Sequence, residues 1–436
     1  MSLRRQSTLI FLTSIIQLAF GMGAGILTAR FLGSTGKGVA LLAFFLPGFL
    51  SSLGSLSIGE GSTYYIGRGV APRKVISNTI IQAFGLGLFY VALGLAFMEP
   101  IRNTVVKDVP AGYFVAGIIV LPLMLLKNYA DGVLVALDRV GDFIAGNMLL
   151  HVSRALLILI ALWPLNLGVW GAVAGEFVSW ILTGGFYLRA MVRGHGFDWK
   201  IDWDLARDQF RYSAITHVGN MAQRMNHQTS TLILSSLKGA QAVGLFSVAT
   251  SIAQILWYLP DAVGRILFPR VASSTRDEAN RLTTLVCRHT LLITAACGLV
   301  VLLSGRWIVE LLYGPEFKDS VGPLLWLLPG IVGSVVTRVL SKYLSGIGKP
   351  NYNAAASVIS FGVNALLLFA LVSAMGLNGA AIAMSVAYVF NGVISLILFM
   401  RVSKTRASES LVPTSADIKT YVDTARQFLA RAMARP

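Results

Sequence analysis

The sequence predicts an all-α protein that crosses a membrane twelve times, built as two bundles of six helices. Of its 436 residues, 55% are hydrophobic and only 13% are charged, and the mean hydropathy is +0.69. Soluble domains carry roughly 25% charged residues, so this chain could not cover a soluble surface. Apolar segments of about 20 residues recur, which is the length of a helix that spans a bilayer core. Several short motifs also repeat at half the chain length.

The apolar segments define the expected spans in order. Transmembrane β-strands would instead give shorter segments of alternating hydrophobicity. An even number of spans places both termini on the same side of the membrane. The twelve spans are expected at about residues 8–32, 39–66, 75–98, 112–136, 146–164, 168–190, 211–236, 242–268, 285–312, 321–346, 352–373 and 378–400.

The basic residues predict which side that is. A net charge of +16 on a soluble protein would suggest a nucleic-acid partner, but here the bases gather in particular loops. The termini and the loops after even-numbered spans hold 24 Lys and Arg, against seven in the other loops, among them Arg30, Lys37 and Lys318. The positive-inside rule therefore predicts cytoplasmic termini. Membrane orientation explains the charge, and no nucleic-acid partner is expected.

The repeats predict how the spans are grouped. Thr28–Phe45 reads TARFLGSTGKGVALLAFF, and its Gly33 and Gly38 match Gly239 and Gly244 at an offset of 206. Two further motifs repeat at offsets of 210 and 208: LVALDR at 134–139 with LSGIGK at 344–349, and GVWGA at 168–172 with GLNGA at 376–380. Six spans per repeat is an even number, so the halves run in the same direction, related by an axis along the membrane normal.

This repeat divides the chain into four parts. We expect an N-terminal bundle at 1–192, an interfacial cytoplasmic linker at 193–210, a C-terminal bundle at 211–401 and a cytoplasmic tail at 402–436. Apolar residues recur at helical spacing over about 415–431, with bases among the polar positions. The tail is therefore either an amphipathic helix on anionic inner-leaflet lipids or a partly disordered segment.

Three stretches of the chain resemble a known family. They are ARFLGSTGKG at 29–38, the run from Tyr212 to Ala272, and GIGKPNYN at 346–353. They are similar to polysaccharide transporters, the Wzx-type lipid-linked oligosaccharide flippases of the multidrug/oligosaccharidyl-lipid/polysaccharide (MOP) exporter superfamily. The resemblance implies two six-helix bundles forming a V in a bacterial cytoplasmic (inner) membrane. It also implies a carboxylate near position 230, where this chain has Ser230.

The same resemblance implies an activity. Such a protein flips an undecaprenyl-pyrophosphate-linked oligosaccharide from the cytoplasmic to the periplasmic leaflet by alternating access. The product supports O-antigen, capsule or exopolysaccharide synthesis, with a polysaccharide polymerase and chain-length machinery as further partners. No cofactor is expected, and coupling to H+ or Na+ is left open.

Charged residues inside the expected spans are the candidate site residues, because charge in a span usually faces a partner or a wet cavity. The sharpest case is Arg224, in the middle of the seventh span. His217, Asn220 and His227 lie on roughly the same helical face. This face is either the wall of a cavity that binds pyrophosphate or acidic sugar, or a set of structural contacts between helices.

The tenth span carries a second basic feature. Arg338 and Lys342 are spaced i, i+4 with no acid between them, so they form a positive strip. An anionic ligand would relieve the repulsion between them, whereas snorkelling to headgroups is the alternative, especially for Lys342. Arg154 in the fifth span has the same two readings.

Other spans pair opposite charges or carry single acids. Lys127–Asp131 and Asp261–Arg265 are i, i+4 pairs, for which an intrahelical salt bridge is the favoured reading over ligand binding. Glu60 lies between two glycines and is an ion-coupling site, a gate partner for Arg265 or one half of an interhelical ion pair. Glu176 is either a coupling site or one half of an interhelical ion pair.

Two other function classes stay open beside the flippase. A cation-coupled multidrug exporter of the same superfamily should line its cavity with carboxylates and aromatic rings, whereas this chain has more bases than acids in its spans. A polyprenyl-linked sugar ligase or polymerase should carry a large catalytic loop. The sequence shows no nucleophile–base set and no metal-ligand cluster, and GSTGKG lacks P-loop spacing. We therefore expect a transporter and no enzyme.

Overall fold

A computed structural model describes the backbone of residues 3–412. Within it, the side chains of 3–12, 215–216, 218–220, 222–223 and 227 are outside the description. The expected amphipathic tail helix at 415–431 therefore lies outside the described residues, as do the side chains of Asn220 and His227.

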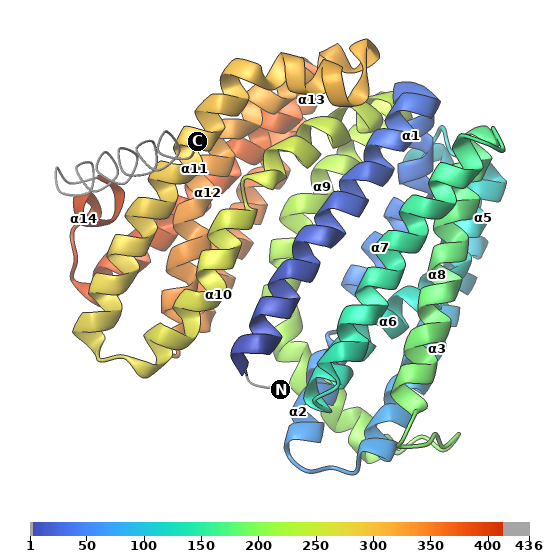
Figure 1. Ribbon diagram of the computed structural model, residues 1–436, viewed down its shortest axis with the longest axis horizontal. Coiled ribbons are helices and arrows are strands. Elements are labelled where there is room, and N and C mark those ends of the chain that lie inside the picture. The colour runs from blue at the N-terminus through green and yellow to red at the C-terminus, as the bar shows by residue number, and fades with distance from the viewer. Residues whose placement is uncertain (1–2, 413–436) are drawn as a thin grey trace, which may run out of the picture.

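Every regular element in the described range is helical (Figure 1). The helices are α1 (Leu3–Gly54), α2 (Ile58–Gly67), α3 (Pro72–Ala96), α4 (Met98–Thr104), α5 (Ala111–Ile119), α6 (Leu121–Ala136), α7 (Val140–Leu162), α8 (Gly168–Val192), α9 (Trp203–Ile255), α10 (Tyr258–Ser273), α11 (Arg276–Tyr313), the 3-10 helix η1 (Pro315–Ser320), α12 (Val321–Gly346), α13 (Pro350–Ser403) and α14 (Ala407–Leu411).

Three of these helices are divided by a glycine. Gly33 in α1 (φ 68°, ψ −174°), Gly239 in α9 (φ 79°, ψ −173°) and Gly376 in α13 (φ 56°, ψ −125°) have non-helical dihedral angles. At Gly33 the chain turns back on itself, so that the Lys37 ammonium donates a hydrogen bond of 2.8 Å to the carbonyl of Gly25, twelve residues earlier. Positive φ favours glycine because a side chain would clash there.

The described residues contain nine helical segments that are long and apolar enough to cross a membrane. Division of α1, α9 and α13 at their glycines turns these nine into twelve apolar segments. The all-helical, membrane-spanning fold class is confirmed, and the exact number of spans stays a prediction.

The three repeated motifs have matching backbone conformations. Gly33 (φ 68°, ψ −174°) and Gly239 (φ 79°, ψ −173°) have closely similar dihedral angles. In the second motif, Asp138 (φ 57°) matches Gly348 (φ 78°) at the offset of 210. In the third, Gly168 (φ 59°) matches Gly376 (φ 56°) at the offset of 208. The chain thus repeats its turns in structure as well as in sequence.

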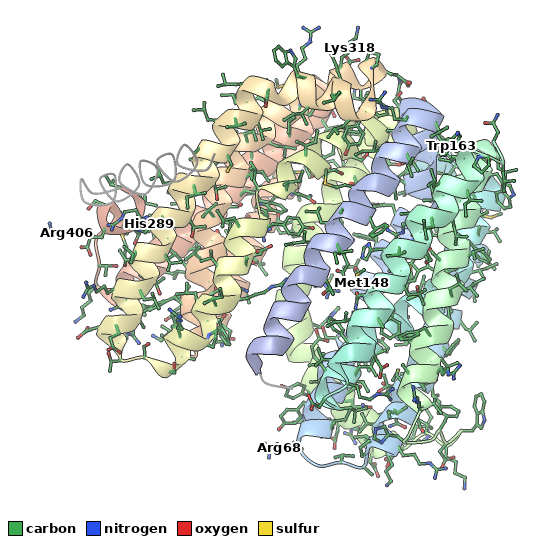
Figure 2. All side chains as sticks on the ribbon, in the orientation of Figure 1. Arg68, Met148, Trp163, His289, Lys318 and Arg406 are labelled. Carbon is green, nitrogen blue, oxygen red and sulfur yellow. The ribbon has the colours of Figure 1, made fainter. Side chains whose placement is uncertain are left out.

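The helices gather in two groups, α1–α8 and α10–α14, with α9 running between them and contacting both (Figure 1). Figure 2 shows that the groups meet at the edge where Trp163 and Lys318 lie, and diverge toward the edge with Arg68. We call the first edge the closed end, defined by residues 33–38, 105–109, 239–244 and 314–320. The opposite edge is the open end.

Polar side chains cap the N-termini of two helices at the open end. The carboxylate of Asp202 accepts a hydrogen bond of 3.1 Å from the backbone N–H of Leu205 and so caps α9. Thr275 and Glu278 form a capping box at the start of α11. Such caps satisfy backbone N–H groups that have no partner within the helix.

Candidate functional site

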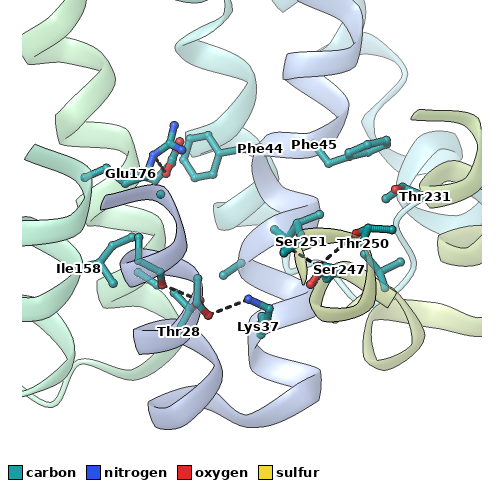
Figure 3. Close-up of a pocket in the computed structure, with 18 residues that line it drawn as sticks. Thr28, Lys37, Phe44, Phe45, Ile158, Glu176, Thr231, Ser247, Thr250 and Ser251 are labelled. Carbon is teal, nitrogen blue, oxygen red and sulfur yellow. Dashed lines mark hydrogen bonds and ion pairs between the residues drawn. The ribbon is translucent and has the colours of Figure 1, made fainter. Parts of the chain in front are cut away.

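Two adjoining pockets lie along α1 and α9, and the second of them reaches α10 and α11. The Lys37 pocket has a volume of about 450 Å³ and is lined by α1, α7, α8 and α9 (Figure 3). The Asp261 pocket has a volume of about 530 Å³ and is lined by α1, α7, α9, α10 and α11. Both pockets are lined by Gly21, Gly25 and Ser251, so they adjoin each other, and we refer to them together as the cavity.

Lys37 is the most deeply buried charge on this cavity, with 7% of its surface exposed. Its ammonium donates to the carbonyl of Gly25 at 2.8 Å and lies 5.5 Å from the centre of the Tyr313 ring. Figure 3 shows the side chain reaching across the pocket from the second half of α1 to the first. Among the described residues Lys37 forms no ion pair.

The outer-loop position predicted for Lys37 is wrong, because Lys37 is buried in α1. The segment GSTGKG resembles a loop, but the turn takes a single residue, Gly33, and the helix resumes at once. Lys37 therefore lies in the first turn of the returning helix and faces its own preceding segment. Its position four residues after a glycine with a repeated equivalent was the signal that could have located it.

Arg154 and Glu176 also line the Lys37 pocket, as an ion pair between α7 and α8. Arg154 Nε lies 2.6 Å from Glu176 Oε2, and the indole N–H of Trp180 donates to Glu176 Oε1 at 3.0 Å. The structure thus favours the interhelical ion pair that was one reading of Glu176. It gives Arg154 a protein partner in place of a lipid headgroup.

Arg338 is paired, contrary to the positive strip expected from the sequence. Its guanidinium lies 2.5 Å from Asp261 Oδ1, between α12 and α10, and 4.0 Å from the centre of the Trp257 ring. Asp261 therefore pairs with Arg338 and not with Arg265. The i, i+4 spacing allowed the intrahelical pair, but α12 presents the closer cation.

The neighbouring bases lie near this pair. Arg265 is exposed and lines the Asp261 pocket, with no ion pair among the described residues. The stem of Lys342 packs against Gly264, where an added Cβ would lie 3.2 Å from Lys342 Cγ. Among the residues that the structure describes, Lys37 and Arg265 therefore line the pockets without an acidic partner.

Lys127 and Asp131 form the predicted intrahelical salt bridge, at 2.7 Å. The carboxylate of Asp131 also accepts hydrogen bonds from the Tyr187 hydroxyl at 2.7 Å and from Asn147 Nδ2 at 3.2 Å. Neither Lys127 nor Asp131 lines the two pockets described above. This network ties α6, α7 and α8 together, so the structural reading is the better one here.

The polar face around Arg224 lies on α9, beside α2. His217 Nδ1 is 3.3 Å from the Ser57 hydroxyl, and both Arg224 and Glu60 lie within electrostatic range of the His217 ring. Arg224 and Glu60 are exposed, and neither lines the two pockets. Binding by Arg224, and a gate between Glu60 and Arg265, stay predictions.

A neutral polar cluster surrounds the position of Ser230. Asn364 on α13 donates to the backbone carbonyl of Asn226 at 3.0 Å, and Asn226 donates to Ser360 at 3.4 Å. Within the described part of the chain, the side-chain oxygens of Asn226, Asn364 and Ser230 are buried without a hydrogen-bond partner. Such oxygens suit a small hard cation, whereas the described residues hold no cluster of three His, Cys, Asp or Glu for a metal ion.

Sequence relatives point to one class of membrane protein. Residues 143–322 match the family described as "Polysaccharide biosynthesis protein". A Haloferax volcanii protein named "Probable low-salt glycan biosynthesis flippase Agl15" is 22% identical over 405 residues, 90% of this chain and 83% of that protein. A "Putative O-antigen transporter" of Shigella flexneri is 23% identical over 54% of this chain and 56% of its own length.

Solved structures agree on the fold. The "Lipid II flippase MurJ, inward closed conformation" superposes with a TM-score of 0.76 at 15% identity, over 91% of this chain and 90% of that one. The "Inward-facing conformation of a multidrug resistance MATE family transporter of the MOP superfamily" gives 0.71 at 15% identity, over 89% and 95%. The chain therefore has the fold of the MOP exporter superfamily and, as the sequence predicted, resembles its polysaccharide transporters.

Proposed function

We propose that the protein is a flippase that moves a polyprenyl-pyrophosphate-linked oligosaccharide from the cytoplasmic to the periplasmic leaflet. One observation carries the proposal: Lys37 is buried in a pocket between α1, α7, α8 and α9, and none of the described carboxylates forms an ion pair with it. A buried charge without a counter-ion is costly. An anionic ligand in the cavity would relieve that cost.

The rest of the cavity suits a glycosylated anion. Arg265 supplies a second cation in the adjoining pocket. The Lys37 pocket is also lined by five hydroxyl groups, from Thr28, Thr231, Ser247, Thr250 and Ser251. Most of them donate to a carbonyl of their own helix, which leaves their lone pairs to accept hydrogen bonds from sugar hydroxyls.

The mechanism follows from these parts. The pyrophosphate and sugars enter from the open end, which the positive-inside rule assigns to the cytoplasm. The polyprenyl chain stays in lipid. Rocking of the two groups of helices then opens the closed end to the periplasm, and no covalent bond is broken. The inner-membrane location, the cytoplasmic termini and the partnership with a polymerase are parts of this proposal.

Depletion of the protein tests the flippase directly. A membrane-impermeant, sugar-modifying probe on intact spheroplasts would report which leaflet holds the lipid-linked unit. We expect the unit to accumulate and to be inaccessible from outside. Accumulation in an accessible form would contradict the proposal and favour a ligase or polymerase, and no accumulation would favour a drug exporter.

Charge substitutions test the role of Lys37. We expect Lys37→Met to abolish export at normal protein abundance and Lys37→Arg to retain much of it, because the arginine keeps the positive charge. Lys107→Met is the matched control, since Lys107 is an exposed base at the closed end. Equal export by Lys37→Met and Lys107→Met would refute the anion-binding role.

We also propose that a cation drives the cycle, either H+ or Na+. Asp131, Glu176 and Asp261 form ion pairs, so a proton on any of them would have to compete with a basic partner. The neutral cluster around Ser230 offers oxygens to Na+ instead. If Na+ binds there, the purified protein should melt at a higher temperature in NaCl than in KCl, and Asn364→Leu should remove that difference.

A further inference from the structure

The closed end is built from two glycine turns that contact each other reciprocally. An added Cβ at Gly38 would lie 1.8 Å from the carbonyl oxygen of Ala240, and one at Gly244 would lie 2.0 Å from that of Ser34. Gly38 and Gly244 are equivalent at the repeat offset of 206, and so are Ser34 and Ala240. The two contacts therefore exchange under the internal symmetry, and the symmetry axis passes between the turns.

A carboxylate from the opposite half caps each of the two helices that begin here. Glu316, in η1, accepts hydrogen bonds from the backbone N–H and the hydroxyl of Ser34, both at 2.7 Å. Asp108, in the loop before α5, accepts one from the backbone N–H of Ala240 at 2.6 Å. Each carboxylate thus crosses from one half of the chain to a helix N-terminus in the other.

The glycines make room for these caps. An added Cβ at Gly33 would lie 2.8 Å from the Glu316 oxygens, and one at Gly239 would lie 2.6 Å from Asp108 Oδ2. Positive φ alone would explain both glycines, but the carboxylates add a second reason. The repeated Gly33–Gly239 pair therefore serves the turn and the cap together.

Both caps are accessible to water, which can compete for their hydrogen bonds. Asp108 and Glu316 are exposed at the closed end, whereas the backbone groups they bind belong to the first turns of long apolar helices. A helix N-terminus attracts negative charge, and a hydrogen bond to a carboxylate is stronger than a neutral one. Exposure keeps the contacts weak enough to release.

We propose that Asp108 and Glu316 form a paired latch that holds the closed end shut, and that both contacts must break when this end opens. The latch depends on the proposed transport function in one respect only: it assumes that the cavity opens alternately to the two sides of the membrane. Contacts made in one state alone stabilise that state over the other. The latch therefore sets the fraction of molecules whose cavity is closed to the periplasm.

A single cysteine in the cavity tests the latch. Ser251→Cys lines both pockets, in a background with Cys287→Ala and Cys297→Ser. The rate of labelling by a membrane-impermeant maleimide on intact cells measures opening of the closed end. We expect Asp108→Asn and Glu316→Gln each to raise that rate by about two- to tenfold, and the double variant to raise it by the product.

The controls separate the latch from other effects. Asp319→Asn removes an exposed acid three residues after Glu316 and should leave the rate unchanged. Should the carboxylate variants fail to fold, Ser34→Ala removes only the hydroxyl contact with Glu316 and should give a smaller increase. Unchanged labelling in these variants, or an equal increase in Asp319→Asn, would overturn the latch. Because labelling needs no glycan, failure of the flippase proposal would show separately, in the leaflet assay.

Discussion

Gly38→Ala should drive the two halves apart at the closed end. Gly38 lies in the first turns of the helix that follows Gly33, where its backbone faces that of Ala240. A methyl group at this position would clash with a backbone oxygen, which cannot move aside as the end of a flexible side chain could. The substitution is therefore a steric probe of the contact between the halves.

The structure gives the size of the effect. The added Cβ would lie 1.8 Å from the Ala240 oxygen, whereas ordinary Cβ contacts begin at 3.4 Å, so the backbones must separate by about 1.6 Å. Overpacking of this kind costs about 1–3 kcal/mol. If the cost falls only on the closed state, opening should become about 5- to 150-fold more favourable.

Gly23→Ala is the matched control, since Gly23 also lies in α1 and an added Cβ there meets nothing within 4 Å. Alanine in a helix gains up to about 1 kcal/mol over glycine, so this control measures the propensity effect alone. We expect Gly38→Ala to melt below Gly23→Ala and to label faster at Ser251→Cys from outside. The reasoning is wrong if Gly38→Ala melts as high as Gly23→Ala and its labelling rate stays that of the parent.

Three further substitutions test single contacts. Asp131→Asn should lower stability by about 1–3 kcal/mol, because Lys127 loses its counter-ion while the hydrogen bonds of Tyr187 weaken; thermal melting of the purified protein would show it. Arg338→Ala should leave the Asp261 carboxylate unpaired, and Arg338→Ala with Asp261→Ala should recover part of the lost melting temperature, which a double-mutant cycle would measure. Asp202→Ala should remove the N-terminal cap of α9 at a cost of about 1 kcal/mol near neutral pH. The Leu205 N–H, followed by Lys74, lowers the pKa of Asp202, so its contribution is present above the unfolded value of about 3.9 and is lost as the pH falls through the folded pKa; pH-dependent melting of Asp202→Ala against the parent would check this.

Local patterns in the sequence located the elements of the fold. Hydropathy placed the apolar helices, because each span must satisfy its backbone hydrogen bonds within itself and bury its side chains in lipid or protein. The glycine motifs located the turns, and their spacing identified the internal repeat. The Lys127–Asp131 salt bridge was also predictable, since both residues lie on one turn of one helix.

These local patterns did not predict the contacts between helices. Asp261 has a cation four residues later, yet it pairs with Arg338, 77 residues away. Spacing along a helix shows which residues of the same helix could pair with Asp261. The packing of α10 against α12 determines that its partner is Arg338. The same limit hid the position of Lys37, because hydropathy alone does not distinguish an outer loop at 33–38 from a one-residue turn at Gly33 followed by a helix.

The internal symmetry makes one contact between the halves imply another. If residue i touches residue j plus 206, then j touches i plus 206, which is how Gly38–Ala240 requires Ser34–Gly244. The caps obey this rule only in part, since Asp108 and Glu316 differ by 208 and Ser34 is matched by an alanine. Glu316 consequently accepts two hydrogen bonds from its helix, whereas Asp108 accepts one.

This asymmetry predicts unequal halves of the latch. Glu316→Gln should raise periplasmic labelling at Ser251→Cys more than Asp108→Asn does, and Ser34→Ala should bring the Glu316 contact down to the strength of the Asp108 contact. In a Ser34→Ala background, the two carboxylate substitutions should therefore have similar effects on the labelling rate. A larger effect of Asp108→Asn in the parent would mean that the number of hydrogen bonds does not set the strength of each cap.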